Sequence, residues 1–355
     1  MTSEFDLIAR FFKRPAPPGM LGVGDDCALF GVPAGRQVAT STDLLLEGRH
    51  FFSDVDPESL GHKALAVNLS DLAAMGATPI GCVLGIGLPH ADEAWVAAFA
   101  KGFNALADRL NCPLIGGDTT RSTQGIVISV TVFGAVDPQH ALRRDNAVVG
   151  DDIWVSGELG AADIAYRLLA GLLPGDPQRL ALVRPALEWP EPHVALGLAL
   201  NGVAHAALDL SDGLLQDLSH ILKASGVGAN IDYAALPIAA VLGDSAQGTD
   251  NTAAVGAAFR STPISPDAVL KPSGPMLPLT EVAVQHAVLG GGDVYTLCFT
   301  AAPERRADVL AAAAQAGTNV SRIGSVRAGT GLTVTDAAGR TLDQLPSGFD
   351  HFQAL

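Results

Sequence analysis

Cysteine, positive charge and long apolar runs are scarce in this sequence, and each shortage excludes a class of protein. The 355 residues include four cysteines that lie far apart, so neither a zinc-binding spacing nor a dense disulfide framework is present. We therefore expect buried thiols in a reducing cytoplasm. Lys and Arg total 22 against 37 Asp and Glu, and the net charge of −15 argues against a protein that coats nucleic-acid phosphates.

Polar residues or glycines interrupt the apolar segments before they reach the span of a transmembrane helix, so no membrane partner is expected. The first six residues carry acids where a signal peptide needs basic residues. The chain also lacks the G-x-x-x-x-G-K-[ST] phosphate-binding loop and the protein-kinase signature set. If it binds a nucleotide, other residues must hold the phosphates.

The sequence does contain enough apolar material for two domains of ordinary size. Hydrophobic residues make up 48% of the chain, and its 39 glycines indicate many tight turns or places where backbone approaches a ligand. The residue pattern predicts helices at 5–12, 56–75, 92–110 and 303–316, one after residue 160 and one ending near residue 224. It predicts strands at 20–24, 37–41, 80–88, 112–115, 126–136, 153–156, 206–208, 295–300 and 320–326.

Strands and helices alternate in both halves of the chain, so we expect an α+β or mixed α/β fold. The pattern breaks between residues 137 and 148, which divides an N-terminal domain (1–137) from a C-terminal domain (148–355). Residues 243–278 are rich in Gly, Ser, Thr, Asp and Pro, and we interpret them as a loop insertion in the second domain.

Carboxylates near the ends of strands and in tight turns are the most informative feature. They are Asp25, Asp26, Asp43, Asp118, Asp209 and Asp212, with Asp71 inside a mostly apolar helix. Any one of them could simply cap a turn or a helix. Several carboxylates in one cleft would repel each other, and hard divalent cations with oxygen ligands remove that repulsion. Because Mg²⁺ prefers a few carboxylates together with phosphate oxygens, the pattern points to a nucleotide or another phosphate ester.

Two further features could contact phosphates. Backbone N–H groups of the Gly116-Gly117-Asp118 turn could donate to phosphate oxygens. Arg143 and Arg144 lie at the domain junction, where one guanidinium could reach a phosphate, although both could equally be solvated surface residues.

Six segments occur in the order and spacing of one family. They are Gly24-Asp25-Asp26-Cys27-Ala28, Ser41-Thr42-Asp43, Glu47-Gly48-Arg49-His50-Phe51, residues 63–77, Gly116-Gly117-Asp118-Thr119-Thr120-Arg121 and Asp209-Leu210-Ser211-Asp212-Gly213-Leu214. Together they resemble the thiamine-monophosphate kinase family over nearly the whole chain. The first segment alone would indicate only the wider superfamily, which includes aminoimidazole ribonucleotide synthetase and selenophosphate synthetase.

The resemblance implies a two-domain, aminoimidazole ribonucleotide synthetase-like fold in which the N-terminal domains pair in a homodimer. It implies in-line transfer of the ATP γ-phosphoryl group to thiamine monophosphate, assisted by several Mg²⁺ ions and without an acid or base catalyst. The implied metal ligands are Asp26, Ser41, Thr42, Asp43, Asp71, Asp118, Asp209 and Asp212. The implied nucleotide contacts are Gly117, Asp118, Arg144 and Ser211, with Arg143 as an alternative to Arg144. The implied substrate contacts are His50, Asp293 and Phe349.

The chain departs from the family pattern at residues 291–297. The family has Gly-Gly-Glu-Asp-Tyr-Glu-Leu, whereas this chain has Gly291-Gly292-Asp293-Val294-Tyr295-Thr296-Leu297. Asp293 has a shorter reach than the family's Glu, and two acids are replaced. Two alternatives therefore stay open: an ATP-dependent synthetase or kinase of the same superfamily with another substrate, and a nucleotide-binding homologue without catalysis. Selenophosphate synthetase is disfavoured because no Cys precedes Cys27.

Overall fold

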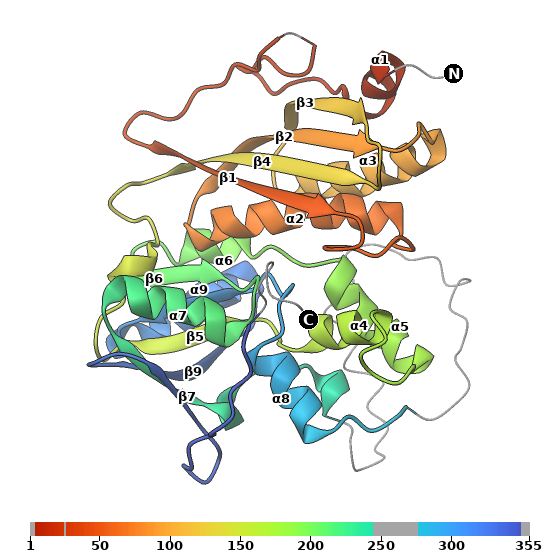
Figure 1. Ribbon diagram of the computed structural model, residues 1–355. Coiled ribbons are helices and arrows are strands. Elements are labelled where there is room, and N and C mark those ends of the chain that lie inside the picture. Colours follow the sequence, from red (N-terminus) through yellow and green to blue (C-terminus); the bar gives the residue numbers. More distant parts are fainter. Residues whose placement is uncertain (1–3, 25, 244–275, 349–355) are drawn as a thin grey trace.

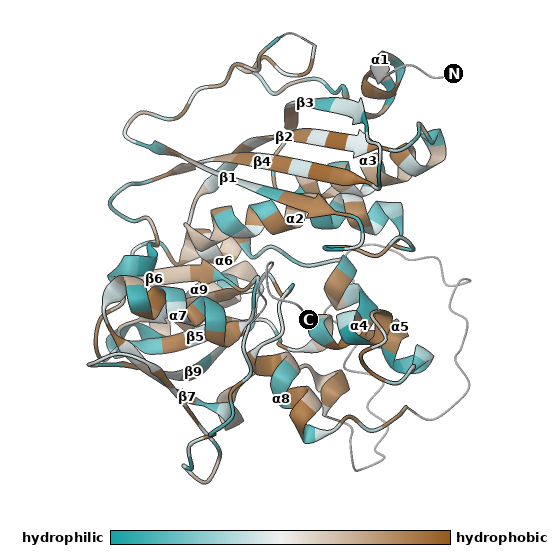
Figure 2. Ribbon diagram, in the orientation of Figure 1, coloured by the Kyte–Doolittle hydropathy of each residue, from teal (hydrophilic) through white to brown (hydrophobic). Residues whose placement is uncertain are grey.

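The computed structural model describes residues 4–24, 26–243 and 276–348, and it contains two sheets with helices packed against them (Figure 1). The first sheet has the strand order β1-β4-β2-β3. Its strands are β1 (Gln37–Leu46), β2 (Thr78–Leu88), β3 (Leu114–Arg121) and β4 (Val127–Val136). β3 runs parallel to β2, and the other neighbours are antiparallel. Figure 2 shows hydrophobic residues along the central strands β2 and β4.

Helices α2 (Pro57–Ala74) and α3 (Glu93–Arg109) pack together beneath this sheet (Figure 1). α2 begins at Asp56, whose side chain accepts the backbone N–H groups of Glu58 and Ser59, and Pro57 occupies the first helical position. The chain leaves the helix at Gly76, where φ is +64°. Residues 59–70 of α2 are all buried, because the helix lies between the first sheet and the C-terminal half of the chain.

The second sheet has the strand order β10-β7-β9-β5-β8-β6. Its strands are β5 (Asp152–Ser156), β6 (Ala206–Asp209), β7 (Gly228–Asp232), β8 (Leu297–Ala301), β9 (Val320–Arg327) and β10 (Leu332–Thr335). The helices of this half are α4 (Ala161–Leu169), α5 (Pro177–Glu188), α6 (Val194–Ala199), α7 (Leu214–Ser225), α8 (Glu281–Leu289) and α9 (Arg306–Ala316). α2 contacts both α6 and β6, so one hydrophobic core joins the two halves.

The mixed α and β character and most of the expected elements are confirmed, and four strand predictions need correction. Residues 20–24 form only an isolated bridge between Leu21 and Leu29, not a strand. β1 continues to Leu46, because its β-branched and apolar residues keep pairing with β4. β3 continues through the expected Gly-Gly-Asp turn. β8 begins at Leu297, because Asp293 and Tyr295 have positive φ angles of 59° and 56° that interrupt strand geometry.

The remaining elements complete the comparison with the sequence. The N-terminal helix is present as α1 (Glu4–Leu7) followed by a π-helical turn (Ile8–Phe12). Helices α5, α6 and α8 and strands β7 and β10 had no counterpart among the predicted elements. Most of the expected insertion at 243–278 lies outside the described residues, and the domain boundary at 137–148 stays a prediction. Within the described ranges, no helix has both the length and the apolar character needed to cross a membrane.

Candidate functional site

Two polar side chains of β1 face α2. Alternation along the strand places Ser41 and Asp43 on the same, inner face of the first sheet. The Ser41 hydroxyl donates a hydrogen bond of 2.5 Å to Oδ2 of Asp71. One turn earlier on the helix, Asn68 Oδ1 accepts the backbone N–H of Asp43 at 2.9 Å. These two hydrogen bonds therefore connect β1 to α2 at the point where β1 carries Asp43 and α2 carries Asp71.

Asp43 and Asp71 share this region with Asp209, which ends β6 of the second sheet. Burial, followed by repulsion from Asp71, raises the pKa of Asp43 to about 6. Burial also raises the pKa of Asp71. The pKa of Asp209 lies well above its ordinary value because of burial and of repulsion from Asp71, Asp217 and Asp43. Three acids that are 28 or more positions apart in the sequence thus interact electrostatically, and together they disfavour their own ionisation.

One of these acids, Asp71, lines a cavity of about 520 Å³. Ser41, Arg143 and Arg144 also line it. Arg143 is paired with Asp145, to which it donates two hydrogen bonds of 2.8 and 2.5 Å. Arg144 is exposed, and its positive charge lowers the pKa of Asp71. Of the two candidate arginines, Arg144 is therefore the one whose charge acts on the acidic cluster.

The segment after β6 carries two more candidates, Ser211 and Asp212, and it is held by a residue that the sequence analysis missed. Asp217, buried in the first turn of α7, accepts the backbone N–H groups of Asp212 and Gly213 at 2.9 and 3.0 Å. Burial raises the pKa of Asp217 to about 7. An acid in the first turn of a helix is favoured by the helix dipole alone, so no separate sequence signal marked this role.

A second cavity, of about 210 Å³, contains two of the expected substrate contacts, His50 and Asp293. Phe52 and Tyr166, whose ring centroids are 6.0 Å apart, also line it. The backbone N–H of Leu46 donates to Nδ1 of His50 at 3.0 Å. A neutral His50 therefore carries its proton on Nε2. Tyr166 was not predicted, since nothing in its sequence context distinguishes it from a core aromatic.

Several expected site residues lie elsewhere. Thr42 points to the outer face of the first sheet, where its hydroxyl is 2.6 Å from that of Thr131. Asp118 is on that outer face too. It pairs with Gly85, which pairs with Ser129, which pairs with the exposed Leu44, and residues paired across neighbouring strands lie on the same face of a sheet. β1 and β3 are separated by two strands, or about 14 Å.

Three other expected positions complete the account. Asp26 lies in an exposed bend, and Phe349 is outside the described residues. Gly117 has φ of +152°, and a Cβ there would lie 2.0 Å from the carbonyl oxygen of Leu84. Glycine is thus required at this position by the close approach of β2 and β3.

The donor set of the acidic cluster fits Mg²⁺. Carboxylates of Asp43, Asp71 and Asp209 and the hydroxyl of Ser41 are hard oxygen ligands, and their mutual repulsion is what a divalent cation relieves. In the described part of the chain, no three His, Cys, Asp or Glu side chains are close enough to hold a metal ion. Mg²⁺ is commonly bound by one or two carboxylates, with substrate phosphates and waters completing its octahedron.

Comparisons with known proteins give one consistent family. The model for the AIR synthase related protein N-terminal domain matches residues 24–136, and the model for the C-terminal domain matches residues 148–337. The thiamine-monophosphate kinase of Salmonella typhimurium is 37% identical over 356 residues, covering 98% of both chains. The crystal structure of thiamine-monophosphate kinase from Stenotrophomonas maltophilia K279a has 41% identity and a TM-score of 0.75, covering 92% of this chain and 93% of that one. AaThiL complexed with AMPPCP and TMP has 27% identity and a TM-score of 0.68, covering 90% and 89%.

Proposed function

Because the chain belongs to the AIR synthase related protein family, and to its thiamine-monophosphate kinases, we propose that it transfers phosphate from ATP to thiamine monophosphate. The chain is an enzyme, a thiamine-phosphate kinase, and ATP is its co-substrate. The observation that carries this conclusion is likeness along the full length of the chain, at 37% to 41% identity, to relatives with that name. A solved relative complexed with AMPPCP and TMP supports the same pair of ligands.

The cavity beside the acidic cluster suits the polyphosphate of ATP. Arg144 would contact phosphate oxygens, and one or two of the carboxylates of Asp43, Asp71 and Asp209 would hold Mg²⁺ together with phosphate oxygens and waters. Bound Mg²⁺ supplies positive charge that offsets both the carboxylates and the phosphates. The acceptor is itself a phosphate oxygen, which is deprotonated near neutral pH, so the chain needs no general base. Its residues contribute by positioning the two phosphates and by stabilising charge.

The smaller cavity suits the acceptor. His50 lines this cavity together with Asp293, so its imidazole is placed where the acceptor would bind. Phe52 and Tyr166 present aromatic faces, on which a planar cationic ring such as a thiazolium is favourably placed. The carboxylate of Asp293 on the wall of the same cavity adds electrostatic attraction for that positive ring.

A homodimer and a cytoplasmic location are part of the proposal. α2 and α3 cover the inner face of the first sheet, while Val38 and Leu44 on the outer face are 51% and 50% exposed. Exposed apolar side chains of this kind, set among the polar residues of the outer face, are what a second copy of the chain would bury. The separated, unpaired cysteines are compatible with a reducing compartment.

The test is an assay of the purified chain with ATP, Mg²⁺ and thiamine monophosphate, in which ADP release and thiamine diphosphate are both measured. We expect the two products in equal amounts, and loss of both when EDTA removes Mg²⁺. A panel of other phosphorylated acceptors, run in parallel, tests the changed segment at 291–297. Faster ADP release with another acceptor, and no thiamine diphosphate, would replace the proposed substrate. ATP binding without stimulation by any acceptor would favour the non-catalytic alternative.

A further inference from the structure

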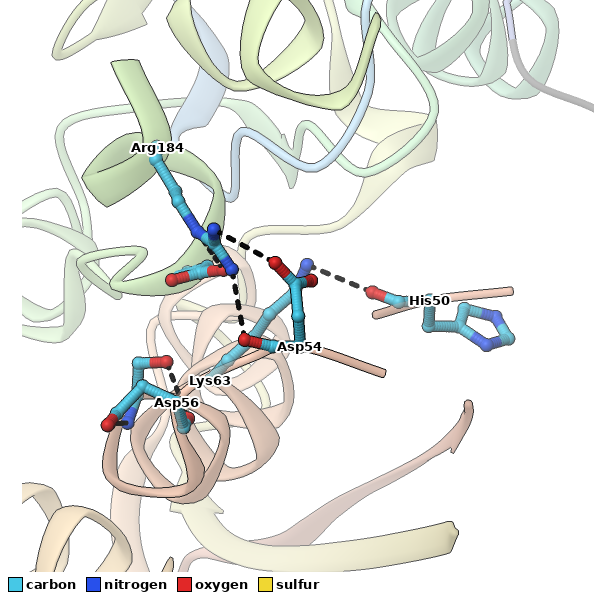
Figure 3. A network of polar contacts seen from close by, with 7 residues as sticks. His50, Asp54, Asp56, Lys63 and Arg184 are labelled. Carbon is cyan, nitrogen blue, oxygen red and sulfur yellow. Dashed lines mark hydrogen bonds and ion pairs between the residues drawn. The ribbon is translucent and has the colours of Figure 1, made fainter. Parts of the chain in front are cut away.

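A buried lysine connects the two expected substrate contacts. Lys63 lies in the second turn of α2, and its side chain is only 3% exposed. Its Nζ is 3.3 Å from the backbone oxygen of His50 and 3.2 Å from Oδ1 of Asp293. Figure 3 shows the ammonium reaching from the helix to His50. Burying an ammonium group costs free energy unless polar or charged partners surround it. The carboxylate of Asp293 and the backbone oxygen of His50 are these partners, and they determine where the Lys63 ammonium lies.

Glu188, another anion near Lys63, is paired with a cation of its own. Glu188, at the end of α5, is close enough for its pKa to be influenced by Lys63. Arg184 binds it at 2.6 Å and also reaches Asp54 Oδ2 at 3.2 Å (Figure 3). Because Glu188 has its own cation, the ammonium of Lys63 is available to pair with Asp293.

Asp293 is fixed from several directions. Its Oδ1 accepts a hydrogen bond of 2.9 Å from the hydroxyl of Tyr295 in addition to the ion pair with Lys63. Its backbone N–H donates to the carbonyl of Ser211, and that of Tyr295 donates to Leu210, each at 2.8 Å. Both Asp293 and Tyr295 have left-handed φ angles, which cost energy and persist only where neighbouring groups hold them. The segment is therefore strained and tied to the loop that carries Ser211.

We propose that Lys63 is a positioning residue for the acceptor substrate: its ammonium holds the Asp293 carboxylate and the chain at His50 on the wall of the smaller cavity. This inference rests on the proposed function. The same helix carries Asp71 eight residues later, about 12 Å along its axis. α2 thus presents the acceptor-side contact and the nucleotide-side acid from one rigid element, which fixes the distance between the two sites.

The ion pair also accounts for how a short carboxylate serves at position 293. An Asp side chain ends one methylene closer to its backbone than a Glu. Lys63 and Tyr295 both bind Oδ1, and neither of these contacts uses Oδ2. The carboxylate therefore keeps one oxygen with which it can face a ligand in the cavity, in an orientation set by the other oxygen.

The test compares Lys63→Met and Lys63→Gln, two neutral variants of similar length, with Lys101→Met as the control. Lys101 is an exposed lysine of α3 paired with Glu58, and neither residue lines either cavity. Each variant is first checked by thermal unfolding, and the neutral variant that folds like the wild type is used. KM for thiamine monophosphate, KM for ATP and kcat are then measured, together with binding of thiamine monophosphate alone by calorimetry. The same substitution is also made in an Asp293→Asn background.

We expect KM for thiamine monophosphate to rise at least tenfold, with KM for ATP within twofold of the wild type. In the Asp293→Asn background the substitution at 63 should add little, because its target is already neutral. Equal effects in both backgrounds, or an unchanged KM for the acceptor in a folded variant, would overturn the role of Lys63. A wild type that makes no thiamine diphosphate would instead overturn the proposed function, so the two failures are separable. If both neutral variants unfold, Tyr295→Phe tests the same held carboxylate, and an unchanged acceptor KM there would also contradict it.

Discussion

Asp43→Asn should make the metal-free protein more stable while it abolishes turnover. Asp43 is half-buried beside Asp71 and within the field of Asp209, and these surroundings disfavour its ionised form. Asn has nearly the same shape and carries no charge. The hydrogen bond to Asn68 is made by the backbone N–H of residue 43 and is kept in the variant. The substitution therefore removes repulsion without removing the contact that fastens β1 to α2.

The magnitude follows from the raised pKa. A carboxyl group whose pKa rises from 3.8 to about 6 is penalised in its ionised form by about 3 kcal/mol in the folded state. With an unfolding entropy of about 2 cal/mol/K per residue, that corresponds to a shift of about 4 °C in the thermal midpoint of the chain. Because the folded pKa is the higher one, the stabilising contribution of protonated Asp43 is complete below pH 3.8. It is lost as the pH rises through about 6.

Thermal unfolding in EDTA, followed between pH 4 and pH 8, measures this effect directly. The advantage of Asp43→Asn should be absent near pH 4 and should reach its full size above pH 6. Asp108→Asn serves as the control, because Asp108 is exposed and paired with Arg14, so its loss should not stabilise the protein. Adding Mg²⁺ and ATP should raise the midpoint of the wild type more than that of Asp43→Asn. A variant that is less stable than the wild type at pH 8, or an advantage independent of pH, would refute the assigned repulsion.

Three further outcomes are expected. In steady-state kinetics, Arg144→Ala should raise KM for ATP about tenfold or more. Arg143→Ala should change KM for ATP less than threefold, because Arg143 is paired with Asp145. The reverse order of the two effects would contradict the assignment. Gly117→Ala should lower the thermal midpoint, because its Cβ would collide with backbone of β2; an unchanged midpoint would show that the strands separate easily. Leu44→Glu should prevent dimer formation in sedimentation experiments if a second copy covers the outer face, and an unchanged dimer would exclude that face.

Long helices and buried strands were predictable from the sequence because their signals are local. α2 has a capping Asp, a Pro at its first position and a Gly just after its end, and its predicted bounds agree with the structure to within a residue. α5 and α8 had no counterpart among the predicted helices. α5 contains an internal Pro185, which obscures the helical pattern. The start of β8 was misplaced because the left-handed Asp293 and Tyr295 are held by contacts with Ser211 and Leu210, which lie more than 80 positions away.

Three acids of the cluster were named from the sequence, but their geometry was not predictable. Asp43, Asp71 and Asp209 share strand ends or apolar surroundings, which the sequence shows, and the structure brings them within electrostatic range. The role of Lys63 depends on Asp293, 230 positions away, so only the folded chain reveals it. In the sequence, Asp217 is explained simply as an acid in the first turn of a helix. The hydrogen bonds that it accepts from the backbone of Asp212 and Gly213 depend on the conformation of the loop, which only the structure shows.

The alternation of side chains along β-strands explains why Thr42 and Asp118, two of the expected ligands, lie away from the acidic cluster. Once β1 is known to continue to Leu46, the period of two requires Thr42 and Leu44 to face away from Ser41 and Asp43. The row from Leu44 through Ser129 and Gly85 then places Asp118 on the same outward face. A contact between Asp118 and the nucleotide bound at the Asp43 side would have to pass through the sheet. If Asp118 binds phosphate or metal, its ligand must therefore lie over the outer face, which is the face that the proposed second copy of the chain would cover.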